Sequence, residues 1–302
     1  MGSQRGHPVI AYAVVTVAWT WSLWWTAALV PDLPGPVRFL LFMTGGLGPL
    51  AGAAWLLRAG SAADRRHFLR RIWDPRGVPV AWWGALVAIA AGPAMLGAVI
   101  ADLAGAAASP PDRGVATVAG VVAFALAAGL VEEPGWRGAA SDAWQARAHP
   151  LLVAVGIGVL WALWHLPLYL VEGSYQQGLG LGSLRFWLTN LVLVQLGVLY
   201  LWLANGSGGS ILLVILAHAG FNATGELVPR SELGDLVAFV AVTLATVTVV
   251  LATRGRLSFT GASTRPLTPG RSKVDRSARA HGFRAGTAVR SRARASGSRT
   301  CP

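Results

Sequence analysis

Three short stretches of the chain combine residue types that can carry out acid–base chemistry. The polar residues of these stretches are Glu132, Glu133, Arg137, His165, His218 and Asn222. Each stretch lies in or beside an apolar segment that otherwise carries no charge in its middle. Ionisable groups are costly in hydrocarbon, so a chain that places several of them there is usually using them. These residues are therefore the candidate site.

The first stretch predicts an ion pair beside a free carboxylate. Glu133 and Arg137 are four residues apart and share a helix face, with the glutamate on the favourable N-terminal side. Glu132 points about 100° away from that pair, so we expect it to face a cavity. Pro134 and Gly135 follow directly and weaken the helix at this point. The alternative is a charged helix end at the membrane surface.

The second and third stretches place histidines on helix faces. His165 follows Trp161 by one helical turn and precedes Pro167, which is expected to bend the helix. His218 and Asn222 are four residues apart and so lie on one face. Taken singly, each has the alternative of a buried residue that hydrogen-bonds between helices. Three helices that each present a polar face favour a shared polar cavity.

The residue types suit hydrolysis by water. A glutamate in a low-dielectric pocket is a usable general base near neutral pH, and a histidine beside it can orient the water. A second histidine and an asparagine amide can donate to the oxyanion that forms when a carbonyl is attacked. No serine or cysteine is placed as a nucleophile within the three stretches.

The elements that position these residues are membrane helices. The 302 residues are 54% hydrophobic and only 13% charged, with a mean hydropathy of +0.53, and their long apolar runs are each sufficient to cross a bilayer. We therefore expect an all-α, polytopic bundle of about eight transmembrane helices with an intramembrane polar cavity. The expected helices cover residues 8–30, 37–57, 79–104, 115–138, 150–171, 184–204, 210–227 and 234–253.

Charge placement predicts the orientation. Six arginines lie between the second and third expected helices, whereas the connections on either side of these helices hold at most one base. By the positive-inside rule this loop is cytoplasmic, so an even helix count places both termini in the cytoplasm. The tail at 261–302 holds ten Arg and Lys against one acid; we expect it to be disordered and near lipid headgroups, with no nucleic acid as a partner.

The three motifs together are similar to those of the CPBP family. Its pattern is Glu-Glu-x-x-x-Arg, then an aromatic residue four positions before His, then His-x-x-x-Asn, on successive membrane helices. The family includes type II CAAX prenyl endopeptidases and the Abi proteins associated with bacteriocin self-immunity. With this resemblance we divide the chain into four parts. These are three N-terminal helices (1–114), a catalytic domain (115–227), a last helix (228–254) and a basic tail (255–302).

The resemblance implies roles for the site residues. Glu132 matches the catalytic glutamate and His165 its partner in activating water, while His218 and Asn222 match the oxyanion donors. Trp161 stands where the family usually has phenylalanine, and Pro134 replaces a small or aliphatic residue. Family members are described as metalloproteases, so a divalent metal such as zinc is one alternative. Its ligands would be Glu132, His165 and His218.

The expected function is therefore an intramembrane endopeptidase in a bacterial plasma membrane, acting on a membrane-embedded or lipidated substrate. Glu133, Arg137 and Trp161 are expected to support the site. One alternative is a non-catalytic immunity or scaffold protein with the same fold. Another is a transporter with a glutamate proton relay, although the chain has no internal repeat.

Overall fold

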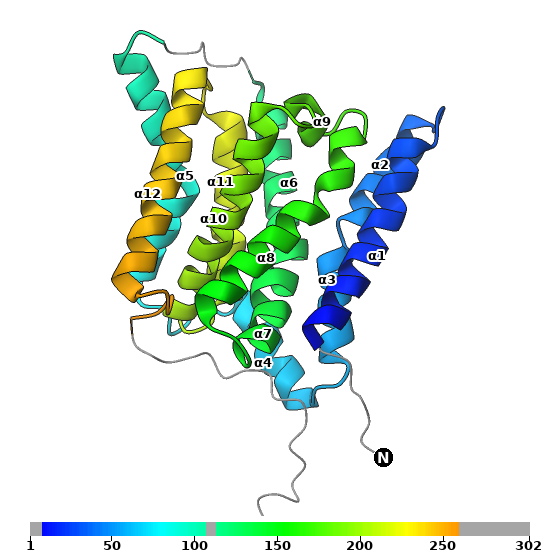
Figure 1. Cartoon of the computed structure of the whole chain (residues 1–302), viewed down its shortest axis with the longest axis vertical. Helices are drawn as coiled ribbons and strands as arrows, with labels where there is room; N and C mark the ends of the chain where they lie inside the picture. The colour runs from blue at the N-terminus through cyan, green and yellow to red at the C-terminus, as the bar shows by residue number, and fades with distance from the viewer. Residues whose placement is uncertain (1–7, 107–112, 260–302) are drawn as a thin grey trace, which may run out of the picture. The chain divides into compact units, whose positions relative to one another are not determined.

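The computed structural model describes residues 8–106 and 113–259, and the described residues form helices joined by turns, with no strand among them. Seven helical stretches are long and apolar enough to span a membrane. The all-α prediction is confirmed, and the chain is an integral membrane protein (Figure 1). The stretches are Pro8–Leu29, Gly35–Leu57, Val80–Leu103, Val115–Gln145, Pro150–Leu170, Leu184–Gly206 and Glu232–Thr253.

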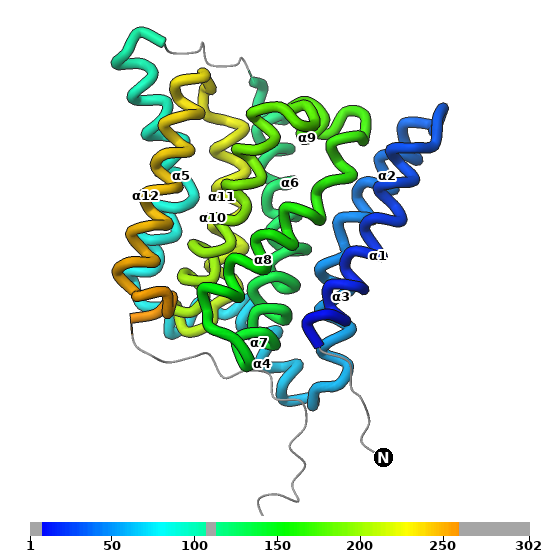
Figure 2. The backbone as a smooth tube through the Cα atoms, in the orientation of Figure 1, coloured from blue at the N-terminus to red at the C-terminus, as the bar shows by residue number. Residues whose placement is uncertain are grey.

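These stretches correspond to seven of the expected segments, and the remaining one is the shorter apolar helix α11 (Ile211–Leu227). Four stretches are single helices: α1 (Pro8–Leu29), α5 (Val80–Leu103), α10 (Leu184–Gly206) and α12 (Glu232–Thr253). The second stretch is divided into α2 (Gly35–Gly45) and α3 (Gly48–Leu57). The tube in Figure 2 shows α12 ending at the end of the bundle where α1 begins.

The two stretches that carry Glu132 and His165 also change helix type. The first consists of α6 (Val115–Glu133), a π-helix (Pro134–Ala140) and α7 (Ser141–Gln145). The second consists of α8 (Pro150–Trp164) and a 3₁₀-helix (Leu166–Leu170).

The arginine-rich loop contains a helix that the expected spans omitted. Helix α4 (Ala62–Trp73) begins with a capping box, in which the hydroxyl of Ser61 accepts from the backbone N–H of Asp64 and the Asp64 carboxylate accepts from Ser61. These hydrogen bonds from Ser61 lower the pKa of Asp64. Arg70 and Arg71 lie in the last turn, where their positive charges interact favourably with the negative end of the helix dipole. A short helix, α9 (Tyr175–Leu179), lies in another connection.

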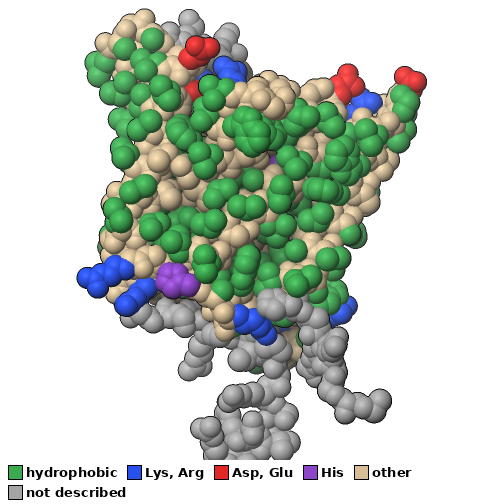
Figure 3. All heavy atoms as spheres, in the orientation of Figure 1, with side chains coloured by type: hydrophobic (Ala, Val, Ile, Leu, Met, Phe, Trp, Pro, Cys, Tyr) green, Lys and Arg blue, Asp and Glu red, His purple; other side chains and the backbone are tan. Residues whose placement is uncertain are grey.

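The outer surface fits a lipid environment. Figure 3 shows hydrophobic side chains over most of one face, with charged side chains at its upper and lower edges. Large apolar residues such as Val87, Val159 and Leu244 are exposed within their helices, away from the helix ends. This distribution of side chains is the reverse of that in a soluble protein. It agrees with helices that span the membrane core.

Close contact between α6 and α11 sets the position of the site. A Cβ added to Gly129 would lie 2.7 Å from the backbone oxygen of Ile215, so only glycine allows the two backbones to approach this closely. Glu132 and His218 each lie three residues after these contact points. The crossing therefore brings the acidic end of α6 beside the histidine of α11.

The basic tail expected at 255–302 lies outside the described residues from residue 260 onward. The four-part division of the chain remains a prediction.

Candidate active site

Glu132 and Glu133 are the last two residues of α6, and both are buried. Pro134 has no N–H to continue the α-helical hydrogen bonds, and the helix passes into the π-helix at this residue. The hydroxyl of Ser141 donates to the backbone oxygen of Trp136 at 2.8 Å, which occupies a carbonyl of the widened turn. Single π-helical turns are frequent at functional sites.

A hydrogen bond from Trp161 fixes the carboxylate of Glu132. Indole Nε1 donates to Oε2 of Glu132 at 2.7 Å, between α8 and α6. Trp161 is 2% exposed and Glu132 is 7% exposed. The other carboxylate oxygen of Glu132, Oε1, makes no hydrogen bond within the described part of the chain. One oxygen is therefore held, and the second is available to another partner.

Glu133 joins α6 to α11. Its carboxylate accepts from Nη1 of Arg137 at 2.9 Å, as the four-residue spacing predicted. The same Oε1 also lies 2.7 Å from Nδ1 of His218. Glu133 is 0% exposed, so it does more than hold a charged helix end. It orients the histidine expected to stabilise an oxyanion.

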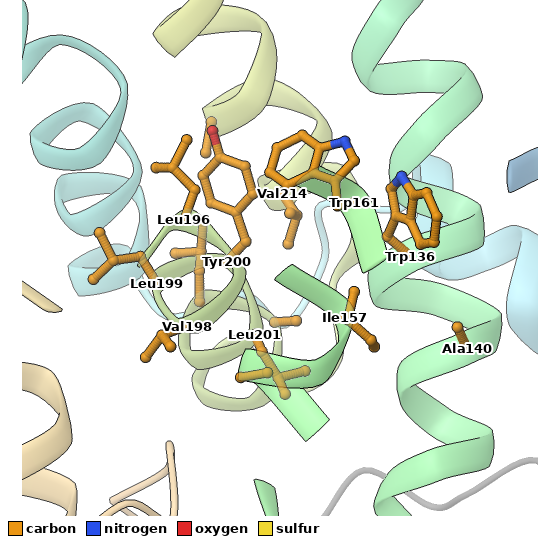
Figure 4. Close-up of a cluster of buried hydrophobic side chains, with 14 of the residues drawn as sticks. Trp136, Ala140, Ile157, Trp161, Leu196, Val198, Leu199, Tyr200, Leu201 and Val214 are labelled. Carbon is orange, nitrogen blue, oxygen red and sulfur yellow. The ribbon is translucent and has the colours of Figure 1, made fainter. Parts of the chain in front are cut away.

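Arg137 is enclosed by aromatic rings. Its guanidinium carbon lies 4.4 Å from the ring centroid of Trp161 and 5.0 Å from that of Tyr200. Nε and Nη2 have no hydrogen-bond partner within the described residues. The faces of the two rings provide part of the stabilisation that these buried donors lack. Figure 4 shows Trp161 beside Tyr200 in this cluster.

His165 follows the last residue of α8, and a 3₁₀-helix containing Pro167 continues the chain. Nδ1 of His165 lies 2.8 Å from the backbone oxygen of Trp161. A carbonyl can only accept, so Nδ1 carries the proton in this contact. In the neutral ring Nε2 is then unprotonated and can accept a proton.

His165 and His218 both lie beside Trp161. The ring centroid of Trp161 is 5.9 Å from that of His165 and 5.3 Å from that of His218. Because Trp161 also bonds Glu132, three of the four candidate residues converge on it. The three residues come from α6, from the position directly after α8, and from α11.

Asn222 lies one turn beyond His218 on α11 and is partly buried. Its amide makes no hydrogen bond to the described residues. His218 uses Nδ1 to contact Glu133, so Nε2 of His218 and the amide of Asn222 have no hydrogen-bond partner among the residues that the structure describes. The structure therefore gives no direct contact that joins Asn222 to Glu132 or His165.

Residues 114–224, which include all four candidate residues, match the family model described as type II CAAX prenyl endopeptidase Rce1-like. This segment is therefore similar to that family. A curated relative, CAAX prenyl protease 2 of Methanococcus maripaludis, is 33% identical over 113 residues. The match covers 37% of this chain and 42% of the relative, so the chain spans less than half of that protein's length.

The residues of the Rce1-like segment do not form the zinc site considered from the sequence. Among the described residues, no group of three or more His, Cys, Asp or Glu side chains is arranged to hold a metal ion. Nδ1 of His165 faces a backbone carbonyl and Nδ1 of His218 faces Glu133. Both contacts leave Nε2 open, as in metal-bound histidines, so the disagreement with zinc rests only on the arrangement of the described side chains.

Two residues of the Rce1-like site carry contacts that the sequence motifs did not indicate. Tyr200 of α10 stacks on His218 with ring centroids 6.0 Å apart. Trp164 packs edge-to-face on His165 at 4.7 Å. Tyr200 and His218 lie on different helices, so only helix packing could reveal their contact, whereas Trp164 directly precedes His165 in the chain.

Two cavities of the described structure lie outside the candidate site. An apolar cavity of about 270 Å³ lies among α5, α10 and α12, and a polar cavity of about 190 Å³ lies beside α4. Neither is lined by Glu132, His165, His218 or Asn222. The Rce1-like site is thus a closely packed cluster in which only His165 and Asn222 are partly exposed.

Proposed function

We propose that the chain is an intramembrane endopeptidase that hydrolyses a peptide bond of a membrane-associated substrate. The observation that carries this proposal is the position of Trp161, which donates to Glu132 and packs against both His165 and His218. This cluster lies in the segment that matches the model of a protease family. In a network with a purely structural role, we would not expect one carboxylate oxygen and two imidazole nitrogens to lack hydrogen-bond partners among the described residues.

The first step is the attack of water on the substrate carbonyl. Glu132 accepts a proton from the water through Oε1, while Trp161 holds Oε2. Nε2 of His165 accepts a hydrogen bond from the same water and orients it. The oxygen of the water then bonds to the carbonyl carbon, and the π electrons of the carbonyl move to its oxygen.

The resulting oxyanion is stabilised by Nε2–H of His218 and the amide of Asn222. His218 can donate through Nε2 while bound to Glu133 only when the imidazole is protonated. Ionised Glu132 and Glu133 with cationic Arg137 leave one net negative charge in this buried cluster. A protonated His218 brings the charge to zero, which favours the donor form.

The last step breaks the carbon–nitrogen bond. The oxyanion electrons return to the carbonyl, and the proton held by Glu132 passes to the leaving amine. The products are a carboxylic acid and an amine, which become a carboxylate and an ammonium when the acid gives its proton to the amine, so the reaction consumes only water. The residues present accomplish each transfer without another reactant.

We propose a lipidated or membrane-embedded peptide as the substrate. The curated relative is called a CAAX prenyl protease, and a hydrolytic site among transmembrane helices is reached most readily by a substrate that is itself held in the membrane. Both chain termini are proposed to lie in the cytoplasm, on the side of the arginine-rich loop.

A cleavage assay with the reconstituted full chain tests the proposal. The probe is a fluorogenic farnesylated peptide with a C-terminal CAAX sequence, beside the same peptide without the lipid. Glu132→Gln removes the base and is expected to lower kcat at least about 100-fold. Glu226→Gln on the exposed end of α11 is the matched control and is expected to keep full activity. Equal cleavage by the two variants would reject the proposal.

A further inference from the structure

A polar cavity lies at the edge of the bundle that carries α4. It is formed between the C-terminal part of α4 with the turn that follows it and the α10–α11 turn, and its volume is about 190 Å³. Figure 2 shows α4 and the α10–α11 turn at the same end of the bundle. Its basic lining residues are His67, Arg70, Arg71 and Arg76.

The floor of the cavity is rigid. Arg71 is 9% exposed, and its Nε donates to the backbone oxygen of Gly209 at 2.6 Å. Its guanidinium also forms a buried ion pair with Asp142 of α7. Ser210, whose hydroxyl caps α11, lies beside it in the cavity. These contacts fix the position of the floor without a ligand.

Gly208 and Gly209 leave the backbone of the α10–α11 turn uncovered. Their φ angles are +77° and +88°, in the region that favours glycine. A Cβ at Gly208 would meet nothing within 4 Å. The turn therefore presents backbone to the cavity, with space in front of it.

The rim carries positive charge that is not balanced by the protein. The side chains of Arg70 and Arg76 form no hydrogen bond or ion pair with the described residues. Among the described residues, Asp74 is the only acid that lines the cavity, and one of its oxygens accepts from the backbone N–H of Arg76. Two guanidinium groups and the ring of His67 thus face one carboxylate, which leaves the cavity with an excess of positive charge.

Exposed apolar side chains stand next to these cations. Leu69 and Trp73 of α4 are 53% and 63% exposed, and Val80 at the start of α5 is 85% exposed. Helix α4 therefore joins an arginine-lined cavity to an apolar surface at the end of two membrane-spanning stretches. A free ion needs only the first feature, whereas a lipid uses both.

We propose that this cavity binds the phosphate group of an anionic membrane lipid. Arg70 and Arg76 contact the phosphate, and Leu69 and Trp73 contact the upper part of the acyl chains. The bound lipid braces Arg71, which is paired with Asp142 of α7, and the cap of α11, which carries His218. Binding does not depend on peptidase activity.

A lipid titration of the purified full chain tests this site. The protein in neutral detergent is titrated with short-chain phosphatidylglycerol, and the apparent Kd is obtained from the rise in Tm. Arg70→Gln/Arg76→Gln is expected to raise this Kd at least about tenfold, because each lost charged hydrogen bond costs about that much or more. Arg65→Gln/Arg66→Gln on the same helix removes the same charge outside the cavity and is expected to keep the wild-type Kd.

Two further titrations identify the ligand. Short-chain phosphatidylcholine is expected to give a much smaller rise in Tm than phosphatidylglycerol does. Inorganic phosphate at matched ionic strength is also expected to give a much smaller rise. An equal rise with inorganic phosphate would overturn the lipid as the source of the phosphate. Equal losses in the two double variants would overturn the cavity as the site. Glu132→Gln is expected to bind as the wild type does, so a failed peptidase assay leaves this result unaffected.

Discussion

Trp161 uses three different parts of its structure in the candidate site. Its indole N–H holds Glu132, its backbone oxygen accepts from His165, and its ring packs against Arg137 and His218. Phenylalanine, which the resembled family usually has here, could supply the ring and the carbonyl but not the N–H. The indole donor is therefore a feature of this chain that acts on the proposed base.

Replacing this donor tests its effect on the base. Trp161→Phe is expected to lower kcat about tenfold or more, since a hydrogen bond to a charged group is worth about 1.5–3 kcal/mol. KM is expected to change little, because the indole positions Glu132 and does not bind substrate. Steady-state kinetics with the farnesylated peptide provide the measurement. Trp202→Phe is the control, since that indole N–H has no partner in the described structure; a similar kcat loss there would contradict the assignment.

Arg137 is expected to matter for stability as well as for activity. Arg137→Gln removes the guanidinium from the buried carboxylate of Glu133 and leaves His218 as its remaining partner, and breaking a buried pair costs about 3–5 kcal/mol. Arg230→Gln breaks an exposed pair with Asp235 and should cost at most about 1 kcal/mol. Thermal unfolding of both variants in detergent gives the comparison. A small loss for Arg137→Gln would mean that the cluster is not held by this ion pair.

The residue contacts divide into those that the sequence could predict and those that it could not. The pair of Glu133 with Arg137 was predicted because a single helix fixes residues four apart. The contacts of Glu133 with His218 and of Glu132 with Trp161 join residues 85 and 29 positions apart. They depend on how three helices are rotated against one another, which one sequence does not specify.

At the level of elements, the α6–α11 crossing determines whether the site can form. Gly129→Ala places a methyl group against the backbone oxygen of Ile215 and must move the two helices apart. We expect a large loss of peptidase activity together with a lower Tm. Gly120→Ala on the same helix meets nothing within 4 Å and should be neutral or slightly stabilising, because alanine favours the helix. Equal activity of the two variants would show that the close crossing is not required.

The apolar segments were predicted well because each has an unbroken run of hydrophobic residues. Helix α4 was not expected, although Ser61 and Asp64 have the spacing of a capping box. Its arginines were interpreted only as an orientation signal. Pro134 indicated a disturbed helix, but a missing N–H can produce a kink, an end or a π-helix. Packing against the neighbouring helices selected the π-helix.

For the whole molecule, the position of the C-terminus tests the orientation. Cys301 is the chain's only cysteine, so a membrane-impermeant maleimide reports on one site without engineered substitutions. With both termini in the cytoplasm, intact cells are expected to show no labelling, and permeabilised cells full labelling. Cys301→Ser is the control for background. Labelling of intact cells would place the tail outside and reverse the orientation.

The net charge of +12 describes the molecule poorly as a single number. Most of it lies in the tail, whereas the described helices carry their charges at two edges and in a few buried groups (Figure 3). Sequence composition was therefore sufficient to predict a membrane protein. It could not predict that some arginines line a cavity and that one of them, Arg71, is buried against Asp142.

The π-helix after Glu133 has a consequence for how this chain can change in length. A π-turn holds one residue more than an α-turn. Deleting one residue between Pro134 and Ala140 would allow an ordinary α-helix, and the apolar character of the span would be preserved. The residues after such a deletion would keep their direction, because the α-turn completes the same rotation with one residue fewer, and Asp142 would still face Arg71. The widened turn thus absorbs one inserted residue, and a one-residue alignment gap at this place would mark a relative with an α-turn whose later side chains keep the same directions.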